Sequence, residues 1–311
     1  MGMRIGISIG TAFSTNGPRG HREGPIMVRS QMQAANRAGL DSLTLGDHHS
    51  TGPGGYVQNV PMLGRLLAEW TDRPAGCLFL VPLWNPVLMA EQIGTLAAMS
   101  SGPFIVQTGL GGGGAQFRAM GVDLAQRAAG LEEGIVLAQA LLRGETVDSA
   151  HWDVHGAHVA PLPPEGVEWW IGGGAAKAID RAARLGDCWY GNADLTPATA
   201  AQHMEVYREA CARHGRSPVR IPIRKDVFIA EDRAAAERVG DALVAGGYRG
   251  FARDAVAYGN PVSVAEQLSA FKELGFTDII IRTMSPIPPE LGPDAADRSV
   301  ELAAEVRAHL G

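Results

Sequence analysis

The most constraining feature of this sequence is a regular alternation of short apolar runs with longer, alanine-rich segments of helical period. Eight apolar, β-rich runs follow one another along the chain, at 4–10, 42–46, 77–83, 104–110, 167–173, 188–191, 221–230 and 278–284. Between them lie helical patterns such as NPVLMAEQIGTLAAMS (85–100), where asparagine followed by proline marks a helix start. Strands that alternate with helices predict a parallel sheet covered by helices.

Eight such units and a final helix favour an α/β fold of the (β/α)8 TIM-barrel type over a doubly wound open sheet, the structural alternative. The length of 311 residues suits one barrel, so we expect a single domain over 1–311 with insertions at the C-terminal face of its strands. Segment 151–166 exceeds an ordinary loop and predicts a hairpin between strands four and five. A second insertion, 246–260, predicts part of a lid near strand seven through its stretch 252–260.

Charge and cysteine content narrow the environment and the partners of this chain. A net charge of −6 argues against a nucleic acid or an anionic membrane surface as the main partner. The three cysteines, Cys77, Cys188 and Cys211, lack metal-ligand spacing, and a sparse, odd set is typical of a reducing cytosol. We therefore expect a cytoplasmic protein without a metal site, a signal peptide or a transmembrane span.

The motif GDHHS (46–50) stands where the second predicted strand ends. Active sites of barrels collect at the C-terminal ends of the strands, and an imidazole there exchanges protons near neutral pH. His48 and His49 are therefore candidate catalytic residues, with Asp47 orienting the imidazole. A zinc site is a weaker alternative, because adjacent histidines point in different directions and no third ligand is close in sequence. A purely structural role, with one histidine capping a turn and the other solvated, is the remaining interpretation.

Two glycine-rich stretches follow strands four and five. In WIGGGAAK (170–177), three glycines permit close approach of a ligand, and the helix that follows offers free N–H groups to a phosphate. Lys177 adds a positive charge there, whereas a tight turn that merely needs glycine is the alternative. In QTGLGGGG (107–114), close approach of a planar ligand to Gly109 and Gly111 and a mobile loop both remain open.

Several stretches together resemble the luciferase-like family of flavin- and deazaflavin-dependent oxidoreductases. They are SLTLGDHH (42–49), LVPLWNPVLMAEQIGTLAAMSSGPFIVQTGLG (80–111), WWIGGGAAKAIDRAARLGDCWY (169–190) and NPVSVAEQLSAFKELGFTDIIIR (260–282). Each motif is weak, but their order and spacing are specific, and they cover nearly the whole chain. The resemblance implies a barrel, often dimeric, that binds a reduced flavin in its mouth.

The resemblance also implies roles for individual residues. The flavin phosphate would lie on Gly172, Gly173 and Gly174 and on the amides of Ala175 and Ala176. Members often have a non-prolyl cis peptide beneath the flavin ring, at the position of Cys77–Leu78 here, and His48 matches a catalytic or flavin-proximal histidine. His49 matches the second histidine of the luciferase-type pair. The end of strand four lacks the glutamate of the sugar-phosphate dehydrogenases and the arginine of the luciferases, so neither of those two activities is implied.

Two chemistries are compatible with this resemblance. In the first, reduced FMN from a separate flavin reductase reacts with O₂ and a small organic substrate is oxygenated, with His48 supplying or holding a proton. In the second, coenzyme F420 transfers a hydride and His48 acts on the substrate oxygen. The DHH motif favours FMN, because it resembles the acid–His–His motif of the luciferases. The low lysine count also favours FMN, because it leaves few lysines for the anionic tail of F420. A non-catalytic flavin-binding partner subunit and a phosphosugar barrel without flavin are the alternatives from other classes.

Overall fold

A closed ring of parallel strands forms the centre of the molecule. The computed structural model describes residues 2–52, 54–218 and 220–311. Within these residues, nine strands form one parallel sheet in the order β10-β9-β6-β5-β3-β1-β13-β11-β12. Their bounds are β1 Arg4–Ile9, β3 Leu43–Leu45, β5 Ala75–Leu80, β6 Phe104–Gly109, β9 Val167–Gly172, β10 Cys188–Tyr190, β11 Pro222–Ile229, β12 Val256–Gly259 and β13 Asp278–Thr283.

Eight of these strands close into a barrel. A parallel bridge between Gly191 and Ile223 joins the end of β10 to the first half of β11, while β12 pairs with the second half of β11. The predicted barrel is therefore confirmed, and β12 is an additional strand outside the ring.

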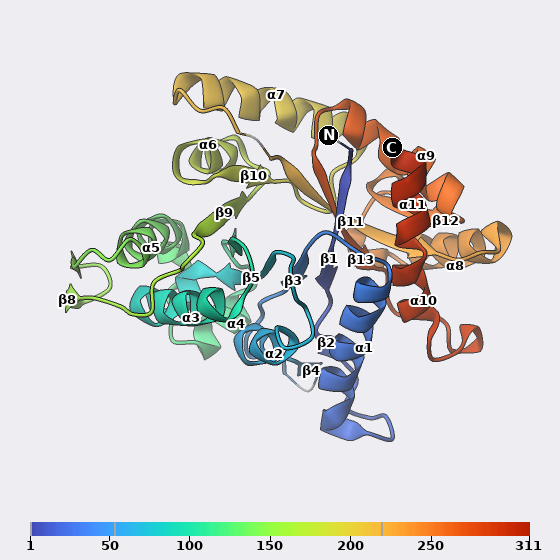
Figure 1. Cartoon of the computed structure of the whole chain (residues 1–311), viewed down its shortest axis with the longest axis horizontal. Coiled ribbons are helices and arrows are strands. Elements are labelled where there is room, and N and C mark those ends of the chain that lie inside the picture. The colour runs from blue at the N-terminus through green and yellow to red at the C-terminus, as the bar shows by residue number, and fades with distance from the viewer. Residues whose placement is uncertain (1, 53, 219) are drawn as a thin grey trace.

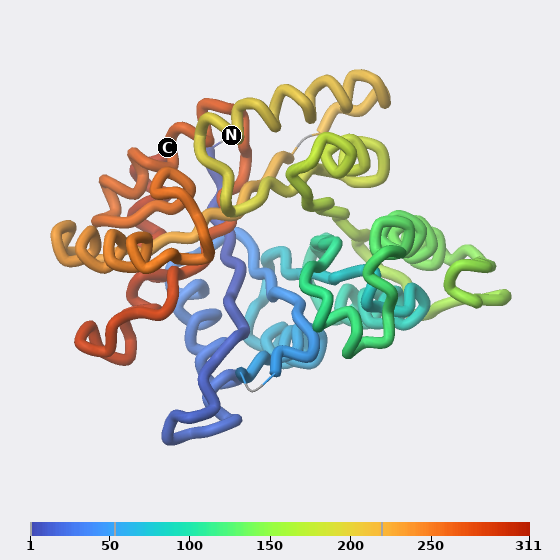
Figure 2. The backbone as a smooth tube through the Cα atoms, turned by 180° about the vertical axis from the view of Figure 1, so that it is seen from behind, coloured from blue at the N-terminus to red at the C-terminus, as the bar shows by residue number. Residues whose placement is uncertain are grey.

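Helices surround this ring of strands, as Figure 1 shows from one side and Figure 2 from the other. The α-helices are α1 Glu23–Arg37, α2 Asn59–Leu66, α3 Pro86–Met99, α4 Gly114–Ala119, α5 Arg127–Leu142, α6 Ala176–Leu185, α7 Pro197–Arg213, α8 Arg233–Ala245, α9 Pro261–Glu273, α10 Ala295–Glu301 and α11 Ala303–Leu310. Short 3₁₀ turns are η1 Gly20–Arg22, η2 Val81–Leu83, η3 Leu124–Gln126, η4 Tyr248–Gly250, η5 Arg253–Ala255 and η6 Pro289–Leu291. In the described part of the chain, no helix is long and apolar enough to cross a bilayer.

Local sequence explains where the helices begin. The Asn85 side chain accepts hydrogen bonds from the amides of Val87 and Leu88 at 2.9 and 3.3 Å, and Pro86 occupies the first turn of α3. Asn260 caps α9 in the same manner, again with proline following. These caps fix the points at which the chain leaves a strand and turns back along the outside of the barrel.

Side chains fill the barrel interior below its mouth. Ile105, Trp170, Cys188, Tyr190 and Ile280 pack together as a buried cluster inside the ring. A larger apolar cluster lies between the strands and the surrounding helices. Because the interior is packed, as in other barrels of this type, space for a ligand remains at the C-terminal ends of the strands.

The two predicted insertions differ from expectation in detail. The hairpin is present, but its antiparallel strands are β7 Val147–Ser149 and β8 Val154–Ala157, so it begins before residue 151. Segment 252–260 is not a lid, because its apolar residues form the buried strand β12 and pair with β11. A further short ribbon pairs β2, Ala12–Phe13, with β4, Gly55–Tyr56.

Candidate active site

Asp47 is the fixed centre of the GDHHS motif. It follows β3 and is almost fully buried. Its Oδ2 accepts hydrogen bonds from the Leu80 amide at 2.7 Å and from the Trp84 indole Nε1 at 2.8 Å. The carboxylate thereby ties the end of β3 to the end of β5, and it holds Trp84 at the edge of the site.

The two histidines point in different directions, as successive residues of an extended chain do. His48 is exposed and lines the mouth of the barrel, with its ring 5.6 Å from that of Tyr56. The His49 Nε2 lies 3.2 Å from Asp47 Oδ1, although the angle between them does not make a hydrogen bond. The expectation that Asp47 orients His48 is therefore corrected: among the residues described, the histidine beside its carboxylate is His49.

A cavity of about 650 Å³ opens at the C-terminal ends of the barrel strands. This volume is within the range typical of sites for small molecules and cofactors. Polar lining residues are Ser8, Glu23, Gln31, Asp47, His48, Tyr56, Gln107, Tyr190, Arg224, Tyr248, Arg249, Arg282, Thr283 and Ser285. Apolar lining residues include Met27, Leu78, Met284 and Ile287. We call the polar lining residues the floor of the cavity and the apolar lining residues its wall.

Two polar groups on this floor lack partners. The Gln107 Nε2 and the Tyr190 hydroxyl are buried and form no hydrogen bond of good geometry within the described residues. Burial raises the pKa of Tyr190 to about 12, so the phenol is a neutral donor near pH 7. Buried polar groups are almost always hydrogen-bonded, and orphans of this kind in a cavity indicate a place for a ligand.

The glycine turn after β9 has the properties of an anion site. Ala175 caps α6 without any side-chain hydrogen bond, so the first amides of this helix are free. Gly173 has a φ of 148°, and a Cβ there would lie 2.5 Å from the Cβ of Ala178, so only glycine fits. The turn adjoins the cavity, because Gly172 pairs in register with Tyr190.

Side chains from the next loop and helix complete this turn. A Cβ on Gly174 would lie 3.3 Å from both the Asn192 amide nitrogen and the His203 ring. The His203 Nδ1 is buried and has no hydrogen-bond partner among the described residues. Lys177 is exposed on the first turn of α6. Asn192 and His203 were not predicted from the sequence, and only their place after strand six in a barrel could have indicated them.

Three other predicted cofactor contacts lie outside the cavity lining. Cys77 is fully buried in the apolar layer outside the ring, and burial raises the pKa of its thiol well above the ordinary value. Gly109 and Gly111 make room for neighbours, since Cβ atoms there would lie 3.0 Å from Leu80 and 3.1 Å from Phe117. Leu78, by contrast, lines the cavity.

The expected cis peptide at Cys77–Leu78 is not present. The cis bonds in the described residues are Ala160–Pro161 and Ser285–Pro286. The chain instead runs through β5 as a regular strand, with Cys77 opposite Val106 and Leu78 opposite Gln107.

Three arginines of the cavity were missed by sequence reasoning. They are Arg224 on β11, Arg249 on η4 and Arg282 on β13. A signal was present for two of them: IPIRKDVFIA and DIIIRTM each carry arginine inside a run that otherwise reads as a buried strand. Arg282 lies near the C-terminal end of β13, where side chains of a barrel reach the mouth, whereas Arg224 lies in the first half of β11.

Comparisons with known proteins agree with this architecture. A barrel with imidazoles and unpaired donors gathered at its C-terminal mouth is typical of enzymes that hold a cofactor there. The family model described as luciferase-like monooxygenase matches residues 3–276. The chain belongs to this family of oxidoreductases.

Individual relatives are distant. A phthiodiolone/phenolphthiodiolone dimycocerosates ketoreductase of Mycobacterium bovis is 25% identical over 225 residues, which are 63% of this chain and 58% of that protein. The match thus spans less than two thirds of that relative. An F420-dependent secondary alcohol dehydrogenase, solved with an F420–acetone adduct, covers 100% of both chains with a TM-score of 0.80 and 16% identity.

A further solved structure is the oxygenating constituent of 3,6-diketocamphane monooxygenase from Pseudomonas putida, in complex with FMN. It aligns over 99% of both chains with a TM-score of 0.78 and 18% identity. At such identities these structures establish the shared fold alone.

Proposed function

We propose that this protein is a flavin-dependent monooxygenase that uses reduced FMN and O₂ on a small organic substrate. The observation that carries this proposal is the adjacency of a ligand-sized cavity, lined by His48, to the uncapped glycine turn at the start of α6. The cavity accommodates a planar ring with a substrate, and the turn accommodates a phosphate.

The residues present fit FMN. The free amides of the first turn of α6, the Asn192 amide and the partnerless His203 Nδ1 would hold its phosphate. The Gln107 Nε2 and the Tyr190 hydroxyl would donate to polar edges of a ring lying over the barrel mouth. Reduced FMN would supply the electrons that activate O₂, a reaction that side chains alone do not perform.

The charge around the glycine turn favours FMN over F420. The basic side chains on and against α6 are already paired with carboxylates: Arg181 and Arg184 with Glu132, and Arg213 and His214 with Asp180. Lys177 is the remaining cation on this helix without an ion pair in the described residues. This arrangement suits one phosphate better than the long anionic tail of F420.

The protein would contribute proton control and orientation. His48 faces the cavity, so its imidazole can deliver or hold a proton at a reacting oxygen. Asp47 holds Trp84 and the end of β5 in place, and His49 would have a secondary role beside that carboxylate. We further propose that a separate reductase supplies the reduced flavin and that the chain assembles as a homodimer.

Hydride transfer with F420 is the second candidate. It is favoured by the ketoreductase relatives, whose name denotes reduction of a ketone rather than oxygenation. The same His48 would then act on the carbonyl or alcohol oxygen of the substrate.

Cofactor binding tests both candidates. The purified apoprotein is titrated with FMN and with F420, each oxidised and reduced, and binding is followed by fluorescence. Tight binding of reduced FMN, followed by substrate-dependent O₂ uptake, supports the proposal. Tight F420 binding with weak FMN binding shifts the assignment to hydride transfer. If neither FMN nor F420 binds, the flavin-type enzyme is refuted and a phosphosugar barrel remains. If FMN binds but turnover is unchanged in His48→Ala, a non-catalytic flavin-binding partner is indicated.

A further inference from the structure

Arg282 lies on the floor of the cavity without an acidic partner. It comes from the end of β13, and its guanidinium lies beside Gly10 and Gly46, the residues that follow β1 and β3. Glycines make room for it: a Cβ on Gly10 would lie 3.3 Å from its Nε, and one on Gly46 would lie 3.4 Å from its Nη2. Within the described residues, no oxygen accepts a hydrogen bond from Arg282 and no carboxylate lies within 4.0 Å of it.

The nearby charges do not neutralise this guanidinium. Arg224 and Arg249 also line the cavity, and both are directed at one buried carboxylate, Asp226, with N–O distances of 3.1 and 3.7 Å. The Tyr248 hydroxyl donates a third contact to Asp226 at 2.8 Å. Arg224 and Arg249 thus share one carboxylate whose two oxygens are occupied, and Arg282 has no carboxylate partner of its own within the described residues.

The other acidic residues of the cavity, Asp47 and Glu23, contact groups other than Arg282. Asp47 accepts hydrogen bonds from Leu80 and Trp84, and Glu23 lies 3.8 Å from Arg19 at the rim. Burial lowers the pKa of Arg282 and Arg224 lowers it further, while Asp226 raises it, and the net direction agrees with a positive charge that is incompletely compensated. A cation left in this state is expensive for the fold, and such groups mark functional sites.

We propose that the substrate of this enzyme is an organic acid whose carboxylate pairs with Arg282 on the cavity floor. A guanidinium recognises a planar carboxylate through two parallel N–H bonds. The wall formed by Met27, Met284 and Ile287 receives the apolar body of that acid. This inference rests on the proposed function, since it assigns the mouth cavity to substrate and the glycine turn of α6 to the cofactor phosphate.

Hexanoate and hexanamide are suitable probes, because they have the same size and shape and differ in charge. Their binding is measured by calorimetry on the cofactor-loaded protein and on the apoprotein. We expect hexanoate to bind at least tenfold more tightly than hexanamide. The Arg282→Met variant should lose that preference and keep its affinity for FMN within about twofold. Arg143→Met, at an exposed site at the end of α5, serves as the matched control.

Thermal stability of the apoprotein gives a second readout. Arg282→Met should raise the melting temperature by a few degrees, because it removes an unpaired and partly buried charge. A lower melting temperature would show that Arg282 is structural and would overturn the proposal. Equal binding of the two probes, or no binding of hexanoate, would overturn it as well.

The two assignments fail in different ways. If Arg282→Met abolishes FMN binding and spares hexanoate, the arginine serves the cofactor and the substrate assignment is wrong. If FMN and F420 do not bind but the hexanoate preference persists and depends on Arg282, the flavin function is wrong and the carboxylate site stands.

Discussion

His48 and Asp47 illustrate how two adjacent residues take separate tasks. Asp47 is buried and its Oδ2 is held by Leu80 and Trp84, whereas His48 is exposed to the cavity. The sequence was sufficient to select this motif, because it follows a predicted strand. It was not sufficient to pair Asp47 with the correct histidine, since that depends on which way each side chain leaves the strand end. Arg282 was missed for a related reason, because its importance lies in the absence of an acidic partner within the described residues, which a sequence does not reveal.

Replacement of His48 is the direct test of its catalytic role. His48→Ala should lower kcat by roughly 10²–10⁴-fold, because a positioned proton donor is removed, and should leave the Kd for FMN nearly unchanged. His49→Ala should have a smaller effect on kcat, since its ring lies against Trp84. Steady-state kinetics and a fluorescence titration measure the two quantities, and a loss of FMN affinity in His48→Ala would assign this residue to cofactor binding.

Lys225 gives a prediction of pH-dependent stability. Its buried ammonium donates to the carbonyl oxygens of Ala193 and Leu195, at 3.2 and 2.7 Å, and lies 4.4 Å from the centre of the Phe271 ring. Burial lowers its pKa from 10.5 to about 7. Between these two values the unfolded chain binds more protons than the native protein, so the free energy of unfolding contributed by this group rises with pH.

The measurement compares urea unfolding of wild type and Lys225→Met from pH 7 to pH 10.5. The wild type should gain stability relative to the variant across this interval, by an amount on the order of a few kcal/mol. A difference that stays constant with pH would show that the lysine titrates normally in the native state.

At the scale of secondary-structure elements, the periodicity of the sequence predicted the eight barrel strands near their observed places. It failed at β12, where the apolar run Val256–Gly259 was interpreted as part of a lid, because whether such a run covers a site or adds to a sheet depends on its partner strand. It also left the helix α8, Arg233–Ala245, undescribed. Strand pairing and loop packing are long-range properties, which local patterns do not contain.

The start of α6 provides a prediction at the same scale. Ala176→Glu places a negative charge at the first turn, where the helix dipole favours it but a bound phosphate repels it. We expect unchanged or slightly higher thermal stability together with at least tenfold weaker FMN binding. Ala198→Glu, in the exposed first turn of α7, is the matched control and should leave FMN affinity unaltered. Equal FMN affinity in both variants would move the phosphate away from this turn.

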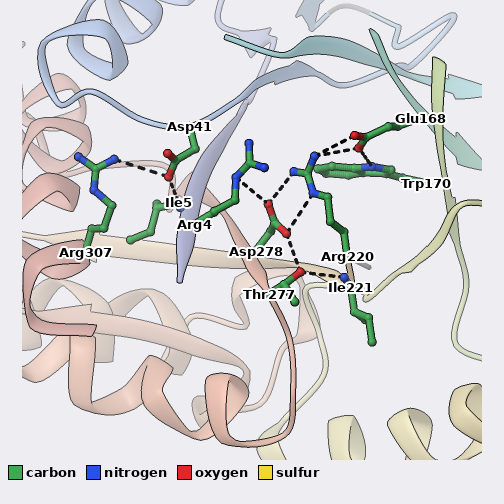
Figure 3. A network of polar contacts seen from close by, with 10 residues as sticks. All are labelled: Arg4, Ile5, Asp41, Glu168, Trp170, Arg220, Ile221, Thr277, Asp278 and Arg307. Atoms are coloured by element: carbon green, nitrogen blue, oxygen red, sulfur yellow. Dashed lines mark hydrogen bonds and ion pairs between the residues drawn. The ribbon is translucent and has the colours of Figure 1, made fainter. Parts of the chain in front are cut away.

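At the scale of the whole molecule, one end of the barrel carries the cavity and the other end carries ion pairs that stabilise the fold. At the end opposite the cavity, Arg220 forms ion pairs with Glu168 at 2.9 Å and with Asp278 at 2.7 Å, and Arg4 lies 3.5 Å from Asp278 (Figure 3). The Asp278 side chain is only 2% exposed. These residues stand at the starts of strands, where barrels place stability rather than catalysis.

Removal of Asp278 should therefore destabilise the protein without altering its site. Asp278→Ala leaves the half-buried Arg220 without one of its partners, and we expect a loss of about 3 kcal/mol in the free energy of unfolding. The double variant Asp278→Leu with Arg220→Met should recover only part of this loss, because it removes the guanidinium that has lost Asp278 but leaves Glu168 without its arginine. Urea unfolding measures the stability, and a weakened FMN affinity in properly folded Asp278→Ala would contradict the separation of the two ends.

The pairing of β1 with β13 has a consequence for synthesis in the cell. β1 is synthesised before its second neighbour, β13, and the two strands are far apart along the chain, with Arg4 opposite Asp278 and Ile7 opposite Ile281. Until then, β1 exposes one row of unpaired backbone groups along an apolar edge, which other nascent chains can bind. The ring cannot close before β13 has been synthesised, so this barrel should depend on chaperones that protect that edge during elongation.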